Sequence, residues 1–192
     1  MPHTVVSIDT PNYLLYLYRK VKANGGRMIR CKISSFNELA GLERIPTAIL
    51  NCCGLGAVDL VQDGSVYPVR GQVLCIEAPQ VKTGLMKRSS RGVYTYVIPS
   101  RQDGDVIIGG CANHNDWDTE ARQELTTSIL HNALALCPDL LPLDRQDGGT
   151  IEDVKVKEVC VGLRPWRQGG PRIEKEEFVV NGLRTPVIHN YG

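Results

Sequence analysis

Apolar residues near the start of the chain recur every three or four positions, as they do along one face of a helix. The residues that carry this stripe are Leu14, Leu17, Tyr18 and Val21. Asp9 or Thr10 can cap such a helix, and Pro11 suits its first turn. Asn24-Gly25-Gly26 is typical of a left-handed helix exit. The pattern therefore predicts one helix between these two signals.

Strand patterns follow. Residues 28–33 alternate between apolar and polar types, which predicts a strand, and residues 34–36 predict a turn after it. The apolar run at residues 47–53 is typical of a buried strand and ends at Gly54-Leu55-Gly56. Open parallel sheets bring main-chain N–H groups close to nucleotides in this way, although Gly-x-Gly by itself also fits a tight turn. Residues 67–76 predict a further strand.

The second half of the chain mixes both kinds of element. Residues 91–99 and 105–110 predict two strands joined by a turn at 101–104, where Asp103-Gly104 favours a hairpin. A helix with an apolar stripe comes next, and Pro138 follows its end. The stripe consists of Leu125, Ile129, Ala133 and Leu136. Residues 154–161 alternate as a strand, so the chain as a whole predicts an α/β (α+β) fold.

Composition limits the classes of function. With 192 residues, 42% of them hydrophobic, the chain can bury one sizeable core or two small ones. A net charge of +1 gives no electrostatic reason to expect nucleic acid or an anionic membrane as a partner. No apolar run approaches the roughly 20 residues of a membrane span, and the first residues lack the features of a secretory signal.

The seven cysteines include no C-x-x-C pair and no Cys/His cluster at metal-ligand spacing. Cys52 and Cys53 are adjacent in an apolar run, where buried thiols are expected rather than a bridge. The cysteine pattern indicates a reducing, intracellular compartment and no metal site.

Three arginines, Arg164, Arg167 and Arg172, stand within nine residues near the end of the chain. Arg164 precedes Pro165, so its main chain is stiff and its guanidinium has few orientations to lose. A guanidinium presented in this way can hold a carboxylate or phosphate through two parallel hydrogen bonds. A surface loop with solvated charges is the alternative interpretation of the same residues.

Several motifs resemble the D-amino-acid oxidase family, whose members are FAD-dependent and include D-aspartate oxidase. Gly-Leu-Arg-Pro-x-Arg, Pro-Arg-Ile-Glu and Val-Ile-His-Asn-Tyr-Gly, in this order, resemble the C-terminal signature of the family. Further matches at residues 51–57, 70–72 and 96–99 extend the resemblance over most of the chain.

The resemblance implies oxidation of a D-amino acid by FAD, hydrolysis of the imino acid to a 2-oxo acid and ammonia, and reduction of dioxygen to hydrogen peroxide. It implies that Arg164 and Tyr96 bind the substrate carboxylate. Tyr94 lies two residues from Tyr96 and therefore on the same face of the strand, with ordinary half-buried packing as the alternative for both tyrosines. No catalytic side chain is expected, because the flavin carries the chemistry.

The resemblance also implies a set of FAD contacts. Main-chain groups of Cys52, Cys53 and Gly54 would touch FAD, and Ile33 would meet its adenine end. Arg70 is expected to be a structural ion-pair partner.

By the same resemblance, residues 1–62 belong to a FAD-binding α/β layer, residues 63–165 to a mixed-sheet substrate-binding domain, and residues 166–192 to a return to the FAD-binding domain. The family's N-terminal Gly-x-Gly-x-x-Gly turn and its C-terminal glycine-rich loop have no match here. We therefore expect a fragment that binds FAD poorly and is inactive by itself.

The resemblance further implies a peroxisomal location, without a targeting signal in this chain and with a cytoplasmic location as the alternative, and it allows a homodimer in the full-length form. By the same resemblance, oxidases for acidic D-amino acids carry one arginine after the Gly-Gly strand and another before the tyrosine strand. Ala112 stands at the first of these positions and favours neutral D-amino acids, whereas Arg88 or Arg91 near the second would favour acidic ones. Three alternatives stay open. The first is another oxidase, either a D-aspartate oxidase or a more distant amine or glycine oxidase of similar build. The others are a non-catalytic α/β remnant or binding module, and a generic nucleotide-binding module using Gly54-Leu55-Gly56.

Overall fold

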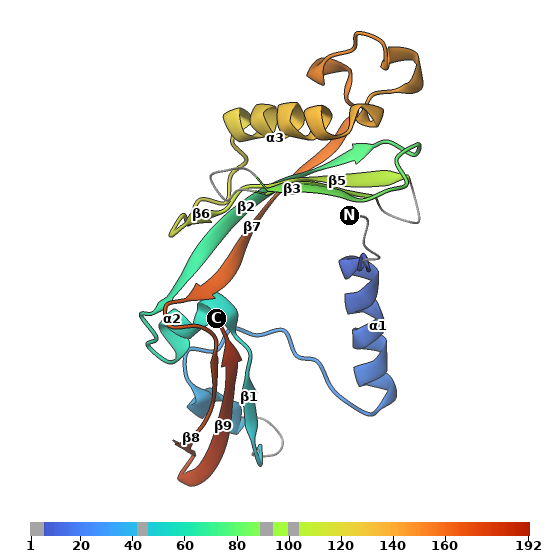
Figure 1. The fold of residues 1–192 in the computed structure, drawn as a ribbon. Coiled ribbons are helices and arrows are strands. Elements are labelled where there is room, and N and C mark those ends of the chain that lie inside the picture. Colours follow the sequence, from blue (N-terminus) through green and yellow to red (C-terminus); the bar gives the residue numbers. More distant parts are fainter. Residues whose placement is uncertain (1–5, 42–45, 89–93, 100–103) are drawn as a thin grey trace. The chain divides into compact units, whose positions relative to one another are not determined.

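The computed structural model describes residues 6–41, 46–88, 94–99 and 104–192, and it contains two compact units. The first unit consists of residues 1–30, 72–111 and 120–161, and the second of residues 31–71, 112–119 and 162–192. Two long strands, β2 (Val66–Glu77) and β7 (Val156–Arg167), pass from one unit into the other. The α/β fold class is confirmed by the helices and sheets drawn in Figure 1.

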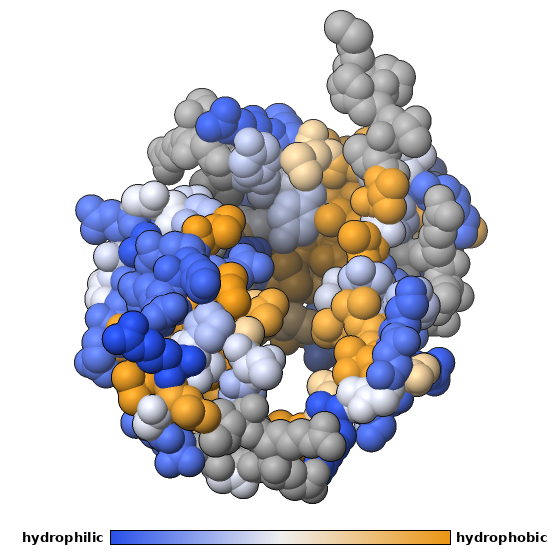
Figure 2. Space-filling model, turned by 90° about the horizontal axis from the view of Figure 1, so that it is seen from below, coloured by the Kyte–Doolittle hydropathy of each residue, from blue (hydrophilic) through white to orange (hydrophobic). Residues whose placement is uncertain are grey.

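Helix α1 (Thr10–Ala23) confirms the first predicted helix and both of its ends. The Asp9 carboxylate accepts a hydrogen bond from the Asn12 N–H at 3.2 Å, and Gly25 follows the helix with φ +79°. The apolar side chains of α1 are exposed, from Tyr13 through Val21, and apolar residues at the molecular surface are orange in Figure 2.

The strand predicted at residues 28–33 is wrong, because these residues pair with no other strand in the described part of the chain. Met28 and Ile29 are exposed to similar extents, 60% and 56%, so the alternation of residue types does not separate an inner from an outer face. The turn at residues 34–36 is confirmed, and it leads into the 3₁₀ helix η1 (Phe36–Gly41).

The first unit is built on an antiparallel sheet covered by one helix (Figure 1). Strands β3 (Leu85–Arg88), β4 (Tyr94–Pro99), β5 (Asp105–Gly109) and the second half of β2 lie side by side in this order. The β4–β5 pairing confirms the predicted strand pair; turn residues 101–103 lie outside the described residues. Strand β3 was missed from the sequence.

Helix α3 (Gln123–Leu136) packs on β4 and β5 and closes the core of the first unit. Its predicted stripe is confirmed, with Ile129 and Ala133 fully buried. The core residues that α3 meets include Leu74, Ile76, Val97, Val106 and Ile108. Short 3₁₀ helices follow α3 before β7 begins: η3 (Pro138–Leu140), η4 (Leu143–Arg145) and η5 (Ile151–Asp153).

The second unit contains a three-stranded sheet in the order β1-β9-β8. Strand β1 (Ile49–Asn51) runs parallel to β9 (Leu183–Tyr191), which forms an antiparallel hairpin with β8 (Arg172–Val180). The buried strand predicted at 47–53 is therefore present but short, and Leu50 is 72% exposed.

Two short helices follow β1, η2 (Gly54–Gly56) and α2 (Ala57–Leu60). The first half of β2 pairs with the two-residue strand β6 (Asn113–His114). Phe36 packs edge-on against Phe178 with ring centroids 5.1 Å apart, and the surrounding core contains Ile49, Val180 and Val187.

None of the helices in the described part of the chain combines the length and the apolar character that a membrane crossing requires. All seven cysteines are free thiols. The predicted burial of Cys52 and Cys53 is wrong, because Cys52 is exposed and Cys53 only half-buried.

Candidate functional site

Arg164 is on strand β7, which continues beyond the strand predicted at residues 154–161, and not in a surface loop. Proline lacks an N–H group and is tolerated at positions where no ladder hydrogen bond is needed, so Pro165 does not end the strand. Strand β7 pairs with β2, and the exposed side chain of Arg164 extends over Gly71 of β2. A Cβ atom added to Gly71 would lie 2.6 Å from Arg164 Cζ.

Arg167, three residues further along β7, is held by ionic contacts. Its Nε donates to Asp63 Oδ2 at 2.8 Å, and its Nη1 donates to the main-chain oxygen of Gly170 at 3.3 Å. The Tyr191 hydroxyl donates to the same Asp63 oxygen at 3.1 Å. Arg172 donates to this hydroxyl from Nη1 at 2.9 Å and pairs with Glu174 and Glu176. Arg167 and Arg172 therefore stabilise the second unit.

These contacts set the ionisation of Asp63. Burial raises the pKa of its carboxyl, but hydrogen bonds from Arg167, from the Ser65 N–H and from Tyr191 outweigh it, so the pKa is below its ordinary value. For Tyr191, burial raises the pKa above its ordinary value. The carboxylate is consequently charged at neutral pH and the phenol is neutral.

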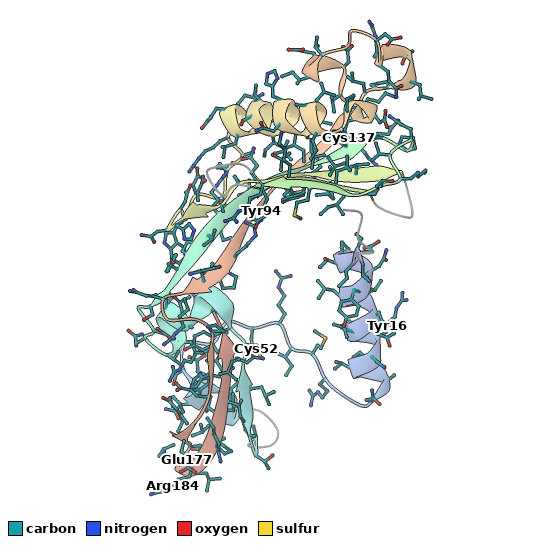
Figure 3. The ribbon with its side chains drawn as sticks, in the orientation of Figure 1. Tyr16, Cys52, Tyr94, Cys137, Glu177 and Arg184 are labelled. Carbon is teal, nitrogen blue, oxygen red and sulfur yellow. The ribbon has the colours of Figure 1, made fainter. Side chains whose placement is uncertain are left out.

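The candidate cofactor segment follows β1. Asn51 is buried, and its Nδ2 lies 3.1 Å from Nδ1 of the fully buried His189 on β9. Its Oδ1 accepts a hydrogen bond from the Cys53 N–H at 3.3 Å. Burial raises the pKa of the Cys53 thiol, which therefore stays protonated at neutral pH. Cys52 is exposed at the end of β1, as labelled in Figure 3.

Gly54 has φ +57°, a conformation that glycine adopts without strain. A Cβ atom on Gly54 would lie 3.5 Å from Pro165 Cγ, so the segment after β1 lies beside the residue that follows Arg164. The fold of the second unit thus brings together two predicted sites that are more than a hundred residues apart in sequence. An exposed strand end with a left-handed glycine suits main-chain contact with FAD, so these residues fit part of a flavin site.

Ile33 is half-buried in the extended segment between α1 and η1. The prediction placed Ile33 at the end of a strand, and this is wrong because residues 28–33 form no strand. Its contact with the adenine end of FAD stays a prediction.

The two candidate tyrosines are on β4 of the first unit. Tyr96 is half-buried and pairs in register with Gly109 of β5. Tyr94 is 46% exposed and pairs with Arg88, whose guanidinium carbon is 5.6 Å from the Tyr94 ring centroid. Arg164 belongs to the second unit, and its joint action with Tyr96 stays a prediction.

Arg70 and Gln72 are fully buried and serve the structure. Arg70 Nε donates to the main-chain oxygen of Asp118 at 2.9 Å, which is a structural contact, and the expected ion pair of Arg70 stays a prediction. Gln72 Oε1 accepts from the Arg122 N–H at 3.0 Å and so caps helix α3. Sequence analysis named Arg70 but overlooked Gly71 between these two residues.

Comparison with known proteins identifies the family. The whole chain, residues 1–192, matches a family model described as FAD dependent oxidoreductase. The chain is 36% identical to D-amino-acid oxidase from Schizosaccharomyces pombe over 98% of its own length and 53% of that relative. It is 34% identical to Homo sapiens D-aspartate oxidase over 98% of its length and 50% of that relative. The chain thus spans about half the length of the curated relatives it matches.

A solved structure supports the fold alone. Glycine oxidase from Geobacillus kaustophilus superimposes with a TM-score of 0.52 at 24% identity, covering 74% of this chain and 36% of that one. The family match extends over every residue of the chain, including the segments around Gly54 and Arg164. The chain belongs to the family of FAD-dependent oxidoreductases that includes the D-amino-acid oxidases.

Proposed function

We propose that this chain is part of an oxidase that converts D-amino acids to 2-oxo acids, ammonia and hydrogen peroxide. The family match over all residues supports this proposal, as do the names of the relatives at 34–36% identity. Because the chain spans about half of those relatives, the proposal concerns the full-length protein that carries it.

The observation that carries the proposal is the position of the residue after Arg164 beside the candidate cofactor segment. This residue, Pro165 on β7, contacts the position of Gly54 after β1. The main chain of Arg164 is therefore near the residues proposed to contact FAD, and its side chain leaves β7 on the face opposite to that of Pro165. A substrate whose carboxylate is fixed near the flavin is what oxidation at the α-carbon requires.

Arg164 would bind the substrate carboxylate through two parallel hydrogen bonds, since its guanidinium is permanently charged and its donor geometry matches a carboxylate. Tyr96 would donate from its phenol to the same carboxylate, and Tyr94 would line the site beside it. With the carboxylate fixed, the direction of the amino group and of the α-hydrogen is determined by the chirality of the substrate.

Cys52, Cys53 and Gly54 would hold FAD through their main chain, and Ile33 would contact its adenine end. When bound, FAD supplies the acceptor for the α-hydride of the substrate and returns the electrons to dioxygen. The residues of the chain bind and orient the substrate, and no acid–base side chain is required of them.

Finer features of the proposal follow the family resemblance. They are an intracellular, peroxisomal location and a homodimer in the full-length form. Residues 1–62 and 166–192 are proposed to form the FAD-binding part and residues 63–165 the substrate-binding part. The compact units divide the chain at other positions, but compactness does not assign a function.

The preferred substrate is proposed to be a neutral D-amino acid, because Ala112 supplies no charge at its position. One observation favours D-aspartate instead: Arg88 lies over the ring of Tyr94 and brings a cation beside a proposed substrate residue. Arg91, the other arginine that would favour an acidic substrate, lies outside the described residues.

The test uses the full-length protein. Flavin absorbance of the purified protein measures FAD binding, and oxygen consumption with D-alanine, D-aspartate and L-alanine measures activity and preference. Bound flavin with D-selective oxygen consumption supports an oxidase, and the better D-substrate separates the two oxidases. A folded protein without flavin would favour the non-catalytic alternative.

The role of Arg164 is tested by Arg164→Ala, with Arg184→Ala as the matched control. The Arg184 side chain is 85% exposed, forms an ion pair with Glu177 at 3.8 Å, and lies near the turn of the β8–β9 hairpin in Figure 3. Arg164→Ala is expected to lower kcat/KM by about a hundredfold or more, because a bound carboxylate loses its partner. A loss below about tenfold, or an equal loss in Arg184→Ala, would overturn the assignment.

A further inference from the structure

Arg164 lies in a space that exists because residue 71 is glycine. A Cβ atom on Gly71 would be 2.5 Å from Arg164 Nη2 and 2.6 Å from Cζ, distances that real Cβ atoms essentially never show. Gly71 itself is buried on β2, whereas Arg164 is exposed on β7. The guanidinium therefore lies directly against the main chain of β2.

The position of Gly71 is fixed by its two neighbours. Arg70 donates to the Asp118 carbonyl at 2.9 Å, and Gln72 donates to Thr126 Oγ1 at 2.9 Å, both from buried side chains. Successive residues of a strand point to opposite faces. Arg70 and Gln72 thus anchor one face of β2, and the glycine between them leaves the other face bare.

Tyr96 in the first unit is placed in the same way. Its register partner on β5 is Gly109, which is also buried. A Cβ atom on Gly109 would be 2.5 Å from the Tyr96 hydroxyl oxygen and 2.6 Å from Cζ. The phenol end of the ring therefore lies close to the main chain of Gly109.

The neighbouring glycine shows what a structural glycine looks like. A Cβ atom on Gly110 would lie 2.7 Å from the main-chain oxygen of Tyr94, which cannot move without moving the strand, and 2.9 Å from Tyr96 Cε1. At Gly71 and Gly109, by contrast, the nearest atoms belong to the ends of side chains. Neither Gly71 nor Gly109 has the positive φ that would make alanine strained.

We propose that Gly71 and Gly109 are positioning residues for substrate binding, because each leaves the space that places a carboxylate-binding side chain, Arg164 or Tyr96. The inference rests on the proposed function of these two side chains. Its physical basis is that a methyl group would push the guanidinium or the phenol away from its strand. A displacement of about 1 Å at a binding group can lower the rate by about a hundredfold.

The main test is Gly71→Ala in the full-length protein, with Gly162→Ala as the matched control. Gly162 is on the same strand as Arg164, two residues away, and a Cβ atom there would meet nothing within 4 Å. Gly71→Ala is expected to raise KM for a D-amino acid by about tenfold or more, with Tm within about 2 °C of the unmodified protein and flavin content unchanged. Gly162→Ala is expected to change none of these.

A double variant shows whether Gly71 acts through Arg164. When Arg164→Ala is already present, adding Gly71→Ala should lower kcat/KM by less than about twofold, because no guanidinium is left to displace. An effect of Gly71→Ala that persists in full beside Arg164→Ala would overturn the proposal. So would a Gly71→Ala protein that loses its fold or its flavin, since the glycine would then serve the structure.

The outcomes separate this inference from the proposed function. If Arg164→Ala abolishes activity while Gly71→Ala keeps KM within about twofold, Arg164 binds substrate but Gly71 does not position it. If Arg164→Ala has little effect on activity, the proposed substrate-binding function of Arg164 is wrong, and the positioning role of Gly71 falls with it.

The pair Gly109 and Tyr96 is tested in the same way. Gly109→Ala should raise KM and have no further effect in a Tyr96→Phe background. Gly110→Ala is expected to lower Tm, because its methyl group meets the main-chain oxygen of Tyr94 in addition to the Tyr96 ring. Equal losses of Tm in Gly109→Ala and Gly110→Ala would contradict a positioning role for Gly109.

Discussion

Arg164 and Arg167 stand three residues apart on the same strand and have different surroundings. The Arg167 side chain is 24% exposed and is held by Asp63, whose own side chain is 8% exposed. Arg164 is exposed and lies across Gly71, where the opposing strand presents main chain without a side chain. Sequence places both in one Gly-Leu-Arg-Pro-Trp-Arg run, and only their neighbours distinguish them.

The difference shows how a strand can stabilise a fold and present a binding group at the same time. A charge in contact with a buried carboxylate contributes to stability, and its removal leaves that carboxylate without its counterion. An exposed guanidinium against a glycine contributes less to stability, and the proposed role of Arg164 is to bind a substrate carboxylate. Stability measurements can therefore separate the two arginines without any substrate.

Arg167→Ala is expected to have the largest effect. It should lower the free energy of unfolding by about 3 kcal/mol, because Asp63 loses its ion pair in a mostly buried place. Urea unfolding of the chain measures this value. Arg184→Ala, which removes an exposed ion pair, should change it by less than about 0.5 kcal/mol. Similar losses of unfolding free energy in Arg167→Ala and Arg184→Ala would show that the Arg167–Asp63 pair stabilises the fold no more than an exposed ion pair does.

Stability should also depend on pH through Asp63. Its pKa is lower in the folded chain than its ordinary value, because the hydrogen bonds from Arg167, Ser65 and Tyr191 outweigh the effect of burial. The carboxylate therefore stabilises the fold above the ordinary pKa, and this contribution is lost as the pH falls through the lowered pKa. Unfolding free energies at descending acidic pH should fall more steeply in the unmodified chain than in Asp63→Asn. Parallel curves would show that Asp63 is not the group responsible.

Tyr191→Phe should have a smaller effect, about 1 kcal/mol. The substitution removes the hydroxyl that donates to Asp63 and accepts from Arg172 but keeps the buried ring. The same urea experiment measures it. If Arg167→Ala is made in addition, the combined loss should differ from the sum of the single losses, because both groups contact one carboxylate. Additive losses would mean that the two contacts are independent.

Arg164→Ala should have the smallest effect on stability, below about 0.5 kcal/mol, as for other exposed side chains. The same substitution is expected to have a large effect on kcat/KM in the full-length protein. A loss of stability comparable to that of Arg167→Ala would show that Arg164 is a structural residue.

Local signals were sufficient for several elements. Helix α1 follows from its apolar spacing, its Asp9 cap and its glycine exit, all of which act within a few residues. The pairing of β4 with β5 follows from two patterned segments around Asp103-Gly104. The strand predicted at residues 28–33 is absent, because alternating apolar and polar residues are only compatible with a strand and do not supply the partner strand that it needs.

The sequence by itself determined the family, the elements with strong local patterns, and the residues to consider: Arg164, Tyr96 and the segment ending at Gly54. It could not distinguish the roles of Arg164 and Arg167, since both are arginines and their spacing along the sequence does not show which residues surround them in the fold. The tertiary structure decided that Asp63 meets Arg167, that Gly71 lies beneath Arg164, and that Gly54 lies beside Pro165. These contacts join positions about a hundred residues apart, and they form only when β7 lies against β2 and β1 against β9.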